Sequence, residues 1–341
     1  MSVNSIERVF NCLEGEQVDR PPIFPMIGDH ACFINGLSYN EMYKSAEKVA
    51  KAHLKALKLY DYDFTTIQVE PSWSVAEACG AKVLYPHDKS PWIKKHLIES
   101  ETDINLLEVP DFLNTTSTYT MIKGTKILAK SVNVPVVAFM TGPLTFSLQL
   151  MPYKKFFRLM SLNKKIIHEL IQKSVQIIIE YVKLLKDAGA SILTICEHDI
   201  QLVSPKIAKY LSFNYLSNIF KTYEFNILHT YGKVYNHLLE NVDLILNMKN
   251  LKSVSIGQFL DINSVLKLFN YEIGVAGNID HVKLLPRGTP SMIIQAVHQA
   301  INESESVPNY MVAPECEITV DTPVNNVKAL VSAVKSFKKK C

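Results

Sequence analysis

The stretch HELIQKSVQIIIEYVKLLKDAGASILTICEHD, residues 168–199, contains the unit that decides the fold. Apolar side chains recur in it at three- and four-residue steps, which predicts an amphipathic helix over 168–187: Ile171, Val175, Ile178, Val182 and Leu185. Ala188-Gly189 then ends that helix. The run 191–196 that follows is almost continuously apolar, as in a strand buried on both faces of a parallel sheet. The stretch therefore predicts a helix followed by a buried strand.

The same alternation of short apolar runs and helical segments extends over the chain. Seven further runs complete a set of eight predicted strands: 23–26, 64–69, 135–140, 226–229, 252–256, 272–276 and 310–313. No Pro/Gly/Ser-rich linker divides the chain, so we expect a single (β/α)8 TIM barrel domain over residues 1–341, with 82–111 as an excursion before the third strand. The α/β alternative is a doubly wound open sheet. It is disfavoured because the turn after the first run, FPMIG at 24–28, lacks the glycine pattern GxGxxG.

Composition excludes several functional classes. The chain has 36 Lys and Arg against 33 Asp and Glu, a net charge of +3 that is too small to indicate a nucleic-acid-binding surface. No stretch has the roughly 18 apolar residues that a membrane span needs, and the first ten residues contain no cleavable apolar segment. Six scattered cysteines without a CxxC pair indicate neither a disulfide framework nor a zinc ribbon. We therefore expect a cytoplasmic protein.

Polar residues follow the predicted strands, where the active site of a barrel forms. They are Asp29, His30, Glu70, Thr141, Glu197, His198, Asp199, His229, Tyr231, Gln258, Asn278, Asp280, Cys316 and Glu317. Side chains of these types bind metal ions and transfer protons. Purely structural roles remain open for three of them: Asp280 as a helix cap, His229 as a hydrogen-bonded core histidine, and Cys316 as a small apolar filler.

Seven segments in order resemble the uroporphyrinogen decarboxylase superfamily, and within it the corrinoid-dependent methylcobamide:coenzyme M methyltransferase type. They are RVFNCLEGEQVDRPP at 8–22, VPVVAFMTGPLTFSLQLM at 134–151, DAGASILTIC at 187–196, LVSPK at 202–206, VAGNID at 275–280, GTP at 288–290 and CEITVDTPVNNVKAL at 316–330. The resemblance covers nearly the whole chain and implies a barrel enzyme.

Decarboxylation is disfavoured within this resemblance. The decarboxylases carry an arginine-containing loop, FMRQAGR, after the first strand, because arginines must neutralise a substrate with many carboxylates. This chain has FPMIGDHA at 24–31 instead. Cys316 also stands where the decarboxylases have a histidine.

The methyltransferase resemblance implies zinc, held by His-x-Cys on one strand and by a cysteine after the last strand. His229 and Cys316 match this pattern, whereas Tyr231 stands in place of the second cysteine. A rebuilt site is expected, in which His198 or Glu197 at the neighbouring strand end supplies the third ligand beside His229 and Cys316.

The expected function is therefore corrinoid-dependent, zinc-assisted methyl transfer between a corrinoid protein and a small methyl donor or thiol acceptor. The resemblance implies that methylcobamide comes from a partner corrinoid carrier protein, since the sequence has no cobalamin-binding Asp-x-His-x-x-Gly. The roles expected for residues at the mouth are catalysis by Glu197, His198 and Tyr231, substrate binding by Glu70, Thr141 and Asn278, and metal binding by His229, Cys316 and His198. Two alternatives stay open: a divergent uroporphyrinogen decarboxylase-like enzyme, and a non-catalytic barrel that binds a ligand or a corrinoid partner.

Overall fold

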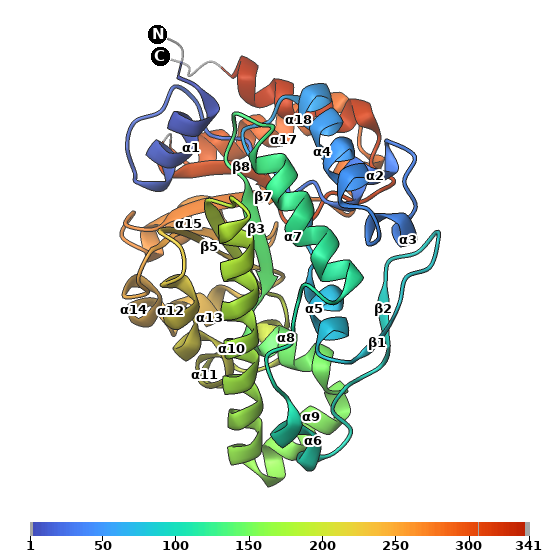
Figure 1. The fold of residues 1–341 in the computed structure, drawn as a ribbon. Helices are drawn as coiled ribbons and strands as arrows, with labels where there is room; N and C mark the ends of the chain where they lie inside the picture. The colour runs from blue at the N-terminus through green and yellow to red at the C-terminus, as the bar shows by residue number, and fades with distance from the viewer. Residues whose placement is uncertain (1–2, 306, 338–341) are drawn as a thin grey trace.

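The computed structural model describes residues 3–305 and 307–337. Six parallel strands lie side by side in chain order and form most of a barrel (Figure 1): β3 (Val137–Thr141), β4 (Ile192–Glu197), β5 (Phe225–Thr230), β6 (Leu251–Ser255), β7 (Gly274–Ile279) and β8 (Tyr310–Pro314). Single parallel bridges close the ring, from Ile23 to Val312 of β8 and from Thr65 to Val136 beside β3. The Asp63 N–H donates to the Ile23 carbonyl and joins the two bridging segments. The predicted (β/α)8 barrel is therefore confirmed.

The first two predicted strands, 23–26 and 64–69, are wrong in extent, because each forms only one bridge. Prolines surround the first segment, and a proline has no N–H to donate to a neighbouring strand. Met26 in the same segment adopts a left-handed φ of 43°. In the second segment the Thr66 hydroxyl donates to the Gln68 carbonyl over 2.9 Å, so a local turn replaces the ladder.

Helices surround the sheet (Figure 1). The α-helices are α1 (Ser5–Leu13), α2 (Asp29–Phe33), α3 (Tyr39–Met42), α4 (Ala46–Tyr60), α5 (Ser72–Ala78), α6 (Glu101–Leu106), α7 (Thr116–Ala129), α8 (Pro143–Leu150), α9 (Tyr153–Leu162), α10 (Lys164–Asp187), α11 (Pro205–Ala208), α12 (Asn214–Phe220), α13 (Tyr235–Leu239), α14 (Val242–Leu246), α15 (Ile262–Leu268), α16 (Leu284–Arg287), α17 (Pro290–Glu303) and α18 (Val324–Ser336). A 3-10 turn, η1 (Asp199–Leu202), follows β4, and a π-helical turn, η2 (Lys209–Phe213), follows α11. None of the described helices combines the length and apolarity that crossing a bilayer needs.

The helix predicted over 168–187 is confirmed as the last six turns of α10. The Asn163 side chain caps its start, and Gly189, with φ of 107°, makes the reversal after its end. The predicted excursion contains a hairpin that the sequence reasoning missed, β1 (Lys82–Leu84) paired antiparallel with β2 (Trp92–Lys95). This hairpin lies at the periphery of the molecule (Figure 1).

Two apolar cores follow from the alternation of side chains along each strand. One face of the strands fills the barrel interior with side chains such as Phe139, Ile192, Ile227 and Met311, and α1 packs against this cluster through Val9, Cys12 and Leu13. The other face, including Leu193, Ile195 and Leu228, packs against the helices. Since neighbouring residues point to opposite faces, a side chain's position in the strand decides whether it reaches the mouth of the barrel.

Candidate active site and metal centre

A row of four residues crosses the carboxyl end of the sheet in register. Thr141 of β3 pairs with Cys196 of β4, Cys196 with His229 of β5, and His229 with Ser255 of β6. All four are completely buried. The Nδ1 atom of His229 lies 2.9 Å from the Ser255 hydroxyl. This contact between neighbouring strands orients the imidazole and leaves its other nitrogen, Nε2, pointing away from Ser255.

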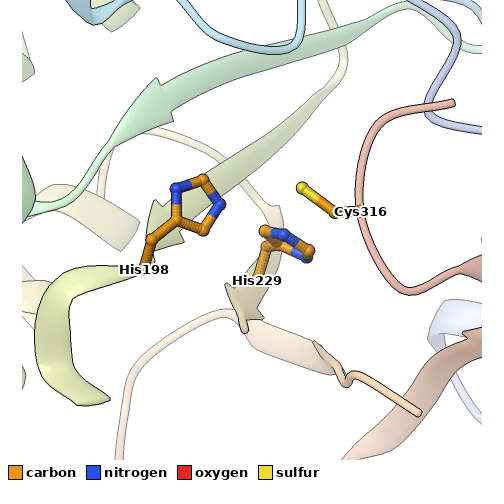
Figure 2. A group of neighbouring side chains, drawn as sticks. All are labelled: His198, His229 and Cys316. Atoms are coloured by element: carbon orange, nitrogen blue, oxygen red, sulfur yellow. The ribbon is translucent and has the colours of Figure 1, made fainter. Parts of the chain in front are cut away.

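His198, His229 and Cys316 come together at this mouth, although they lie far apart in the chain. His198 follows β4, His229 belongs to β5, and Cys316 follows β8. One potential ligand atom from each lies within 4.8 Å of the other two, and Figure 2 shows the three side chains converging on one space. The two imidazole rings meet edge to face with their centroids 5.2 Å apart.

The histidines of this group have free metal-binding nitrogens. The Nε2 atoms of His198 and His229 are both buried and have no hydrogen-bond partner in the described part of the chain. Such an unmatched buried polar atom costs about 1–3 kcal/mol. Burial lowers the pKa of both imidazoles, that of His229 well below its ordinary value, and so favours the neutral form that binds metal ions.

The cysteine of this group completes a donor set that fits zinc. Burial raises the pKa of the Cys316 thiol to about 12, so the thiolate needs a cation beside it to form at neutral pH. Two nitrogens and one sulfur are typical zinc ligands, with bonds of about 2.0–2.3 Å, and three protein ligands leave a fourth position for a substrate. His198, His229 and Cys316 would hold the ion, and bound zinc would act as a Lewis acid on a substrate heteroatom.

Glu197 does not lie in this group. Strand β4 continues through position 197, one residue further than the sequence analysis expects, so the Glu197 side chain points away from the face that carries Cys196. Its carboxyl group is fully buried and accepts the Thr145 N–H at the start of α8 over 3.2 Å. Gly142 makes room for it, since a Cβ atom there would overlap the Glu197 side chain. Burial raises the pKa of Glu197 to about 8, which keeps the group protonated at neutral pH.

Tyr231 lies beside the candidate ligands. Its ring centroid is 6.3 Å from that of His198 and 6.0 Å from that of His281, in both cases edge to face. Thr141 is buried in the row described above, and its hydroxyl has no hydrogen-bond partner among the described residues. Both residues therefore lie at the carboxyl end of the sheet, as the sequence analysis expects.

Glu70 and Asn278, the other two residues expected to bind substrate, are bound to the protein itself. The Glu70 carboxylate accepts the Ser72 N–H over 2.9 Å at the start of α5. Asn278 belongs to β7 instead of following it, and its amide donates to the Leu260 carbonyl over 2.8 Å. Asn278 lines a cavity of about 480 Å³ between the β6 and β7 loops and α17, apart from the His-His-Cys group.

Carboxyl groups gather on one side of the mouth. The Glu317 carboxyl accepts the Asp29 N–H over 2.7 Å. Burial and the neighbouring Glu70 raise the pKa of Asp29 to about 7, and burial and Asp29 raise that of Glu317 well above its ordinary value. In residues 3–305 and 307–337, none of Asp29, Glu70 and Glu317 forms an ion pair with lysine or arginine. This side of the mouth is thus unsuited to a polyanionic substrate.

The sequence reasoning missed Ser255, His281 and Glu315. His281 directly follows the VAGNID segment, and Glu315 directly precedes Cys316, so their places at strand ends were available as a signal. Ser255 is the last residue of β6. Its hydrogen bond to His229 depends on the pairing of β5 with β6.

Fold and site together define a (β/α)8-barrel protein with a candidate His-His-Cys metal centre at the carboxyl ends of its strands. The chain belongs to the uroporphyrinogen decarboxylase family, whose model matches residues 4–337. This confirms the family resemblance expected from the sequence.

Relatives in this family carry decarboxylase names. A uroporphyrinogen decarboxylase from Francisella philomiragia is 25% identical, over 94% of this chain and 96% of the relative. One from Xylella fastidiosa is 23% identical, over 87% of each.

Two solved structures share the fold. A methyltransferase from Methanosarcina mazei superposes with a TM-score of 0.86 over 98% of this chain and 99% of its own, at 20% identity. A B12-independent methionine synthase from Shewanella reaches a TM-score of 0.53 over 85% of this chain and 88% of its own, at 13% identity. At these identities the likeness concerns the fold.

Proposed function

We propose that the protein is a zinc-assisted methyltransferase that moves a methyl group between a corrinoid protein and a small substrate at the mouth of the barrel. The observation that carries this proposal is the convergence of His198, His229 and Cys316 within 4.8 Å. Both imidazoles have a buried Nε2 atom without a hydrogen-bond partner among the described residues, as a catalytic zinc site with three protein ligands requires.

The roles of the surrounding residues follow from their places. Zinc bound by the three ligands would polarise the heteroatom that gives or receives the methyl group. Tyr231, next to His198, donates a hydrogen bond from its hydroxyl to an oxygen or sulfur of the substrate. The Thr141 hydroxyl, which has no hydrogen-bond partner in residues 3–305 and 307–337, and the carboxyl of Glu70 contribute to the wall of the substrate site. Methylcobamide is supplied by the partner corrinoid protein.

The nitrogen-rich ligand set bears on the substrate. With one thiolate in place of the two that the resembled methyltransferases carry, the ion would keep more Lewis acidity. Such a centre polarises the leaving oxygen of a methyl donor better than a thiolate-rich one. It also lowers the pKa of a bound thiol, so both a methyl donor and a thiol acceptor suit the site.

A second candidate function, decarboxylation of a porphyrinogen, is favoured by the names of the relatives. The charges of the residues at the mouth argue against this function. A substrate bearing many carboxylates needs cationic partners, and Asp29, Glu70 and Glu317 line this mouth without any ion pair to lysine or arginine in the described residues.

Metal analysis and two activity assays on the purified protein test the proposal. We expect about one zinc per chain, demethylation of methylcobalamin by at least one compound in a panel of thiols, or methyl transfer from a methoxyl donor to cob(I)alamin, and no loss of carboxylate from uroporphyrinogen. Decarboxylation without methyl transfer would establish the second candidate. A protein without zinc and without either activity would be a non-catalytic barrel.

A further inference from the structure

A second pair of interacting side chains lies beside the candidate metal centre. The Nδ1 atom of His281, which follows β7, is 2.9 Å from Oε1 of Glu315, which follows β8. We propose that His281, oriented by Glu315, is the proton-transfer residue of this mouth. It takes the proton from the substrate heteroatom before that atom accepts a methyl group and returns it in the reverse direction. This inference rests on the methyl-transfer function proposed above.

Glu315 is fixed in place by three donors. Its carboxylate is completely buried and accepts the Gln258 N–H over 2.9 Å, the Gln258 side-chain amide over 3.1 Å, and His281 Nδ1. The Glu315 carboxylate can only accept a hydrogen bond. Nδ1 of neutral His281 therefore carries the proton and donates the hydrogen bond, and the lone pair lies on Nε2. The tautomer that can act as a base is therefore selected by the fold.

The base nitrogen of His281 is available. No group in the described part of the chain hydrogen-bonds to its Nε2 atom, and the side chain is 11% exposed, so the ring is nearly enclosed but keeps some contact with solvent. Tyr231 packs edge to face against both His281 and His198, with ring centroids 6.0 and 6.3 Å away. The base and the candidate metal ligand His198 thus lie at the same mouth, and both contact the ring of Tyr231.

The proposed step balances without an oxidant or reductant. For a substrate R–XH, where X is sulfur or oxygen, the X–H bond breaks and an Nε2–H bond forms on His281. The electron pair of the broken bond stays on X, which then bonds to the methyl carbon. The bond between that carbon and the cobalt of the partner's corrinoid breaks at the same time, and its electron pair leaves with the cobalt. The resulting imidazolium is stabilised by the adjacent Glu315 carboxylate, as in other carboxylate-oriented histidine bases.

The alternative is that the pair only ties the β7 loop to the β8 loop. The variant His281→Asn distinguishes this structural role from proton transfer, because the asparagine amide can still donate a hydrogen bond to Glu315 whereas no base remains. His298→Gln is the matched control, since His298 lies in α17 and its Nε2 bonds to the Ala333 carbonyl at 3.3 Å, in the outer helical layer.

The assay uses methylcobalamin with two thiols, an aryl thiol that is already ionised at the assay pH and an alkyl thiol that is not. We expect His281→Asn to slow the reaction of the alkyl thiol by about a hundredfold or more, to change that of the aryl thiol only severalfold, and to keep the wild-type zinc content and unfolding midpoint. His298→Gln should react with both thiols at wild-type rates.

Equal losses for the two thiols in His281→Asn, or no loss for either, would overturn the inference while leaving methyl transfer established. A wild-type protein inactive both with the two thiols and in methyl transfer from a methoxyl donor to cob(I)alamin would instead remove the proposed function and this role with it. A second readout does not depend on activity: imidazole ¹⁵N NMR of the wild type should show His281 protonated at Nδ1 and bare at Nε2. The opposite tautomer would also overturn the inference.

Discussion

The Ser255 hydroxyl lies 2.9 Å from Nδ1 of His229, on the neighbouring strand. This contact leaves Nε2 as the nitrogen of His229 that can bind an ion, and Nε2 is buried without a partner in the described part of the chain. A second residue that orients a ligand in this way is usual at metal sites, where the outer partner sets the tautomer and the ring angle. Ser255 thus belongs to the candidate centre although it touches no ion itself.

Ser255→Ala tests this relationship. We expect zinc affinity to fall by about 10–100-fold, the usual effect of removing an outer-shell partner of a metal-binding histidine. Competition with a chromophoric chelator measures the change. Ser253→Ala is the matched control, because Ser253 is buried two residues earlier on β6 and has no hydrogen-bond partner among the described residues. Equal affinities in the two variants would mean that Ser255 does not orient His229 for metal binding.

Cys316→Ala should remove most of the bound zinc, because it deletes the single thiolate of the ligand set while leaving both histidines in place. The barrel should remain folded, since Cys316 lies after β8 in a loop and not within a strand. Elemental analysis and far-UV circular dichroism check the two expectations. Cys79→Ala, which alters a half-buried cysteine just after α5, should keep the full zinc content. A full zinc complement in Cys316→Ala would rule this centre out.

Glu197→Gln should keep both the zinc content and the fold. The Glu197 carboxyl faces the start of α8, and its pKa of about 8 means that a neutral amide replaces a group that is already neutral at pH 7. His198→Ala, one residue along, should bind zinc much more weakly. If Glu197→Gln loses zinc and His198→Ala retains it, the assignment of the third ligand is reversed.

Asp63→Ala should destabilise the fold by about 3–5 kcal/mol, the usual cost of breaking a buried ion pair from one side. The Asp63 carboxylate is 1% exposed and accepts from Arg8 over 2.9 Å, from Arg20 over 2.7 Å and from the Ile23 N–H over 2.9 Å. Urea unfolding at pH 7 measures the loss. Asp61→Asn, at an exposed ion pair with Lys335, should change stability by at most about 1 kcal/mol.

The Asp63 carboxylate should also make the stability of the fold depend on pH. Burial opposes ionisation of Asp63, but hydrogen bonding to Arg20 and the arginine charge outweigh it and lower the pKa below its ordinary value. A lowered folded-state pKa means that this stabilisation is present above the unfolded pKa of about 3.9 and is lost as the pH falls through the folded value. The stability difference between the wild type and Asp63→Ala should therefore shrink as the pH falls below about 4. A constant difference would contradict the assignment.

Much of the fold could be predicted because its signals are local. The apolar steps of α10 and the mainly apolar runs of most strands from β3 to β8 are properties of neighbouring residues, and burial on both faces selects such runs. The segments at 23–26 and 64–69 could not be predicted as single bridges. Their apolar content resembles that of strands, while prolines and a threonine side chain remove the ladder hydrogen bonds.

The candidate site likewise contains residues that could be predicted from the sequence and one choice that depends on the structure. His229 and Cys316 could be selected from the sequence because family motifs mark their positions. His198 is the expected third ligand, but Glu197 stays open as its alternative in the sequence. The choice depends on whether β4 ends at residue 196 or 197, because a shift of one residue turns a side chain from the barrel interior to the helical layer.

The sequence by itself determined the order of strands and helices, the family, and the candidate metal ligands His229 and Cys316 with His198 or Glu197 as the third, since each of these is encoded in short-range patterns. Only the tertiary structure decided which third side chain reaches His229 and Cys316, that Ser255 orients His229, and that His281 meets Glu315 from 34 residues away. The physical reason is that these contacts depend on strand register and on barrel closure. Both arise from the packing of the whole chain, so no short segment can encode them alone.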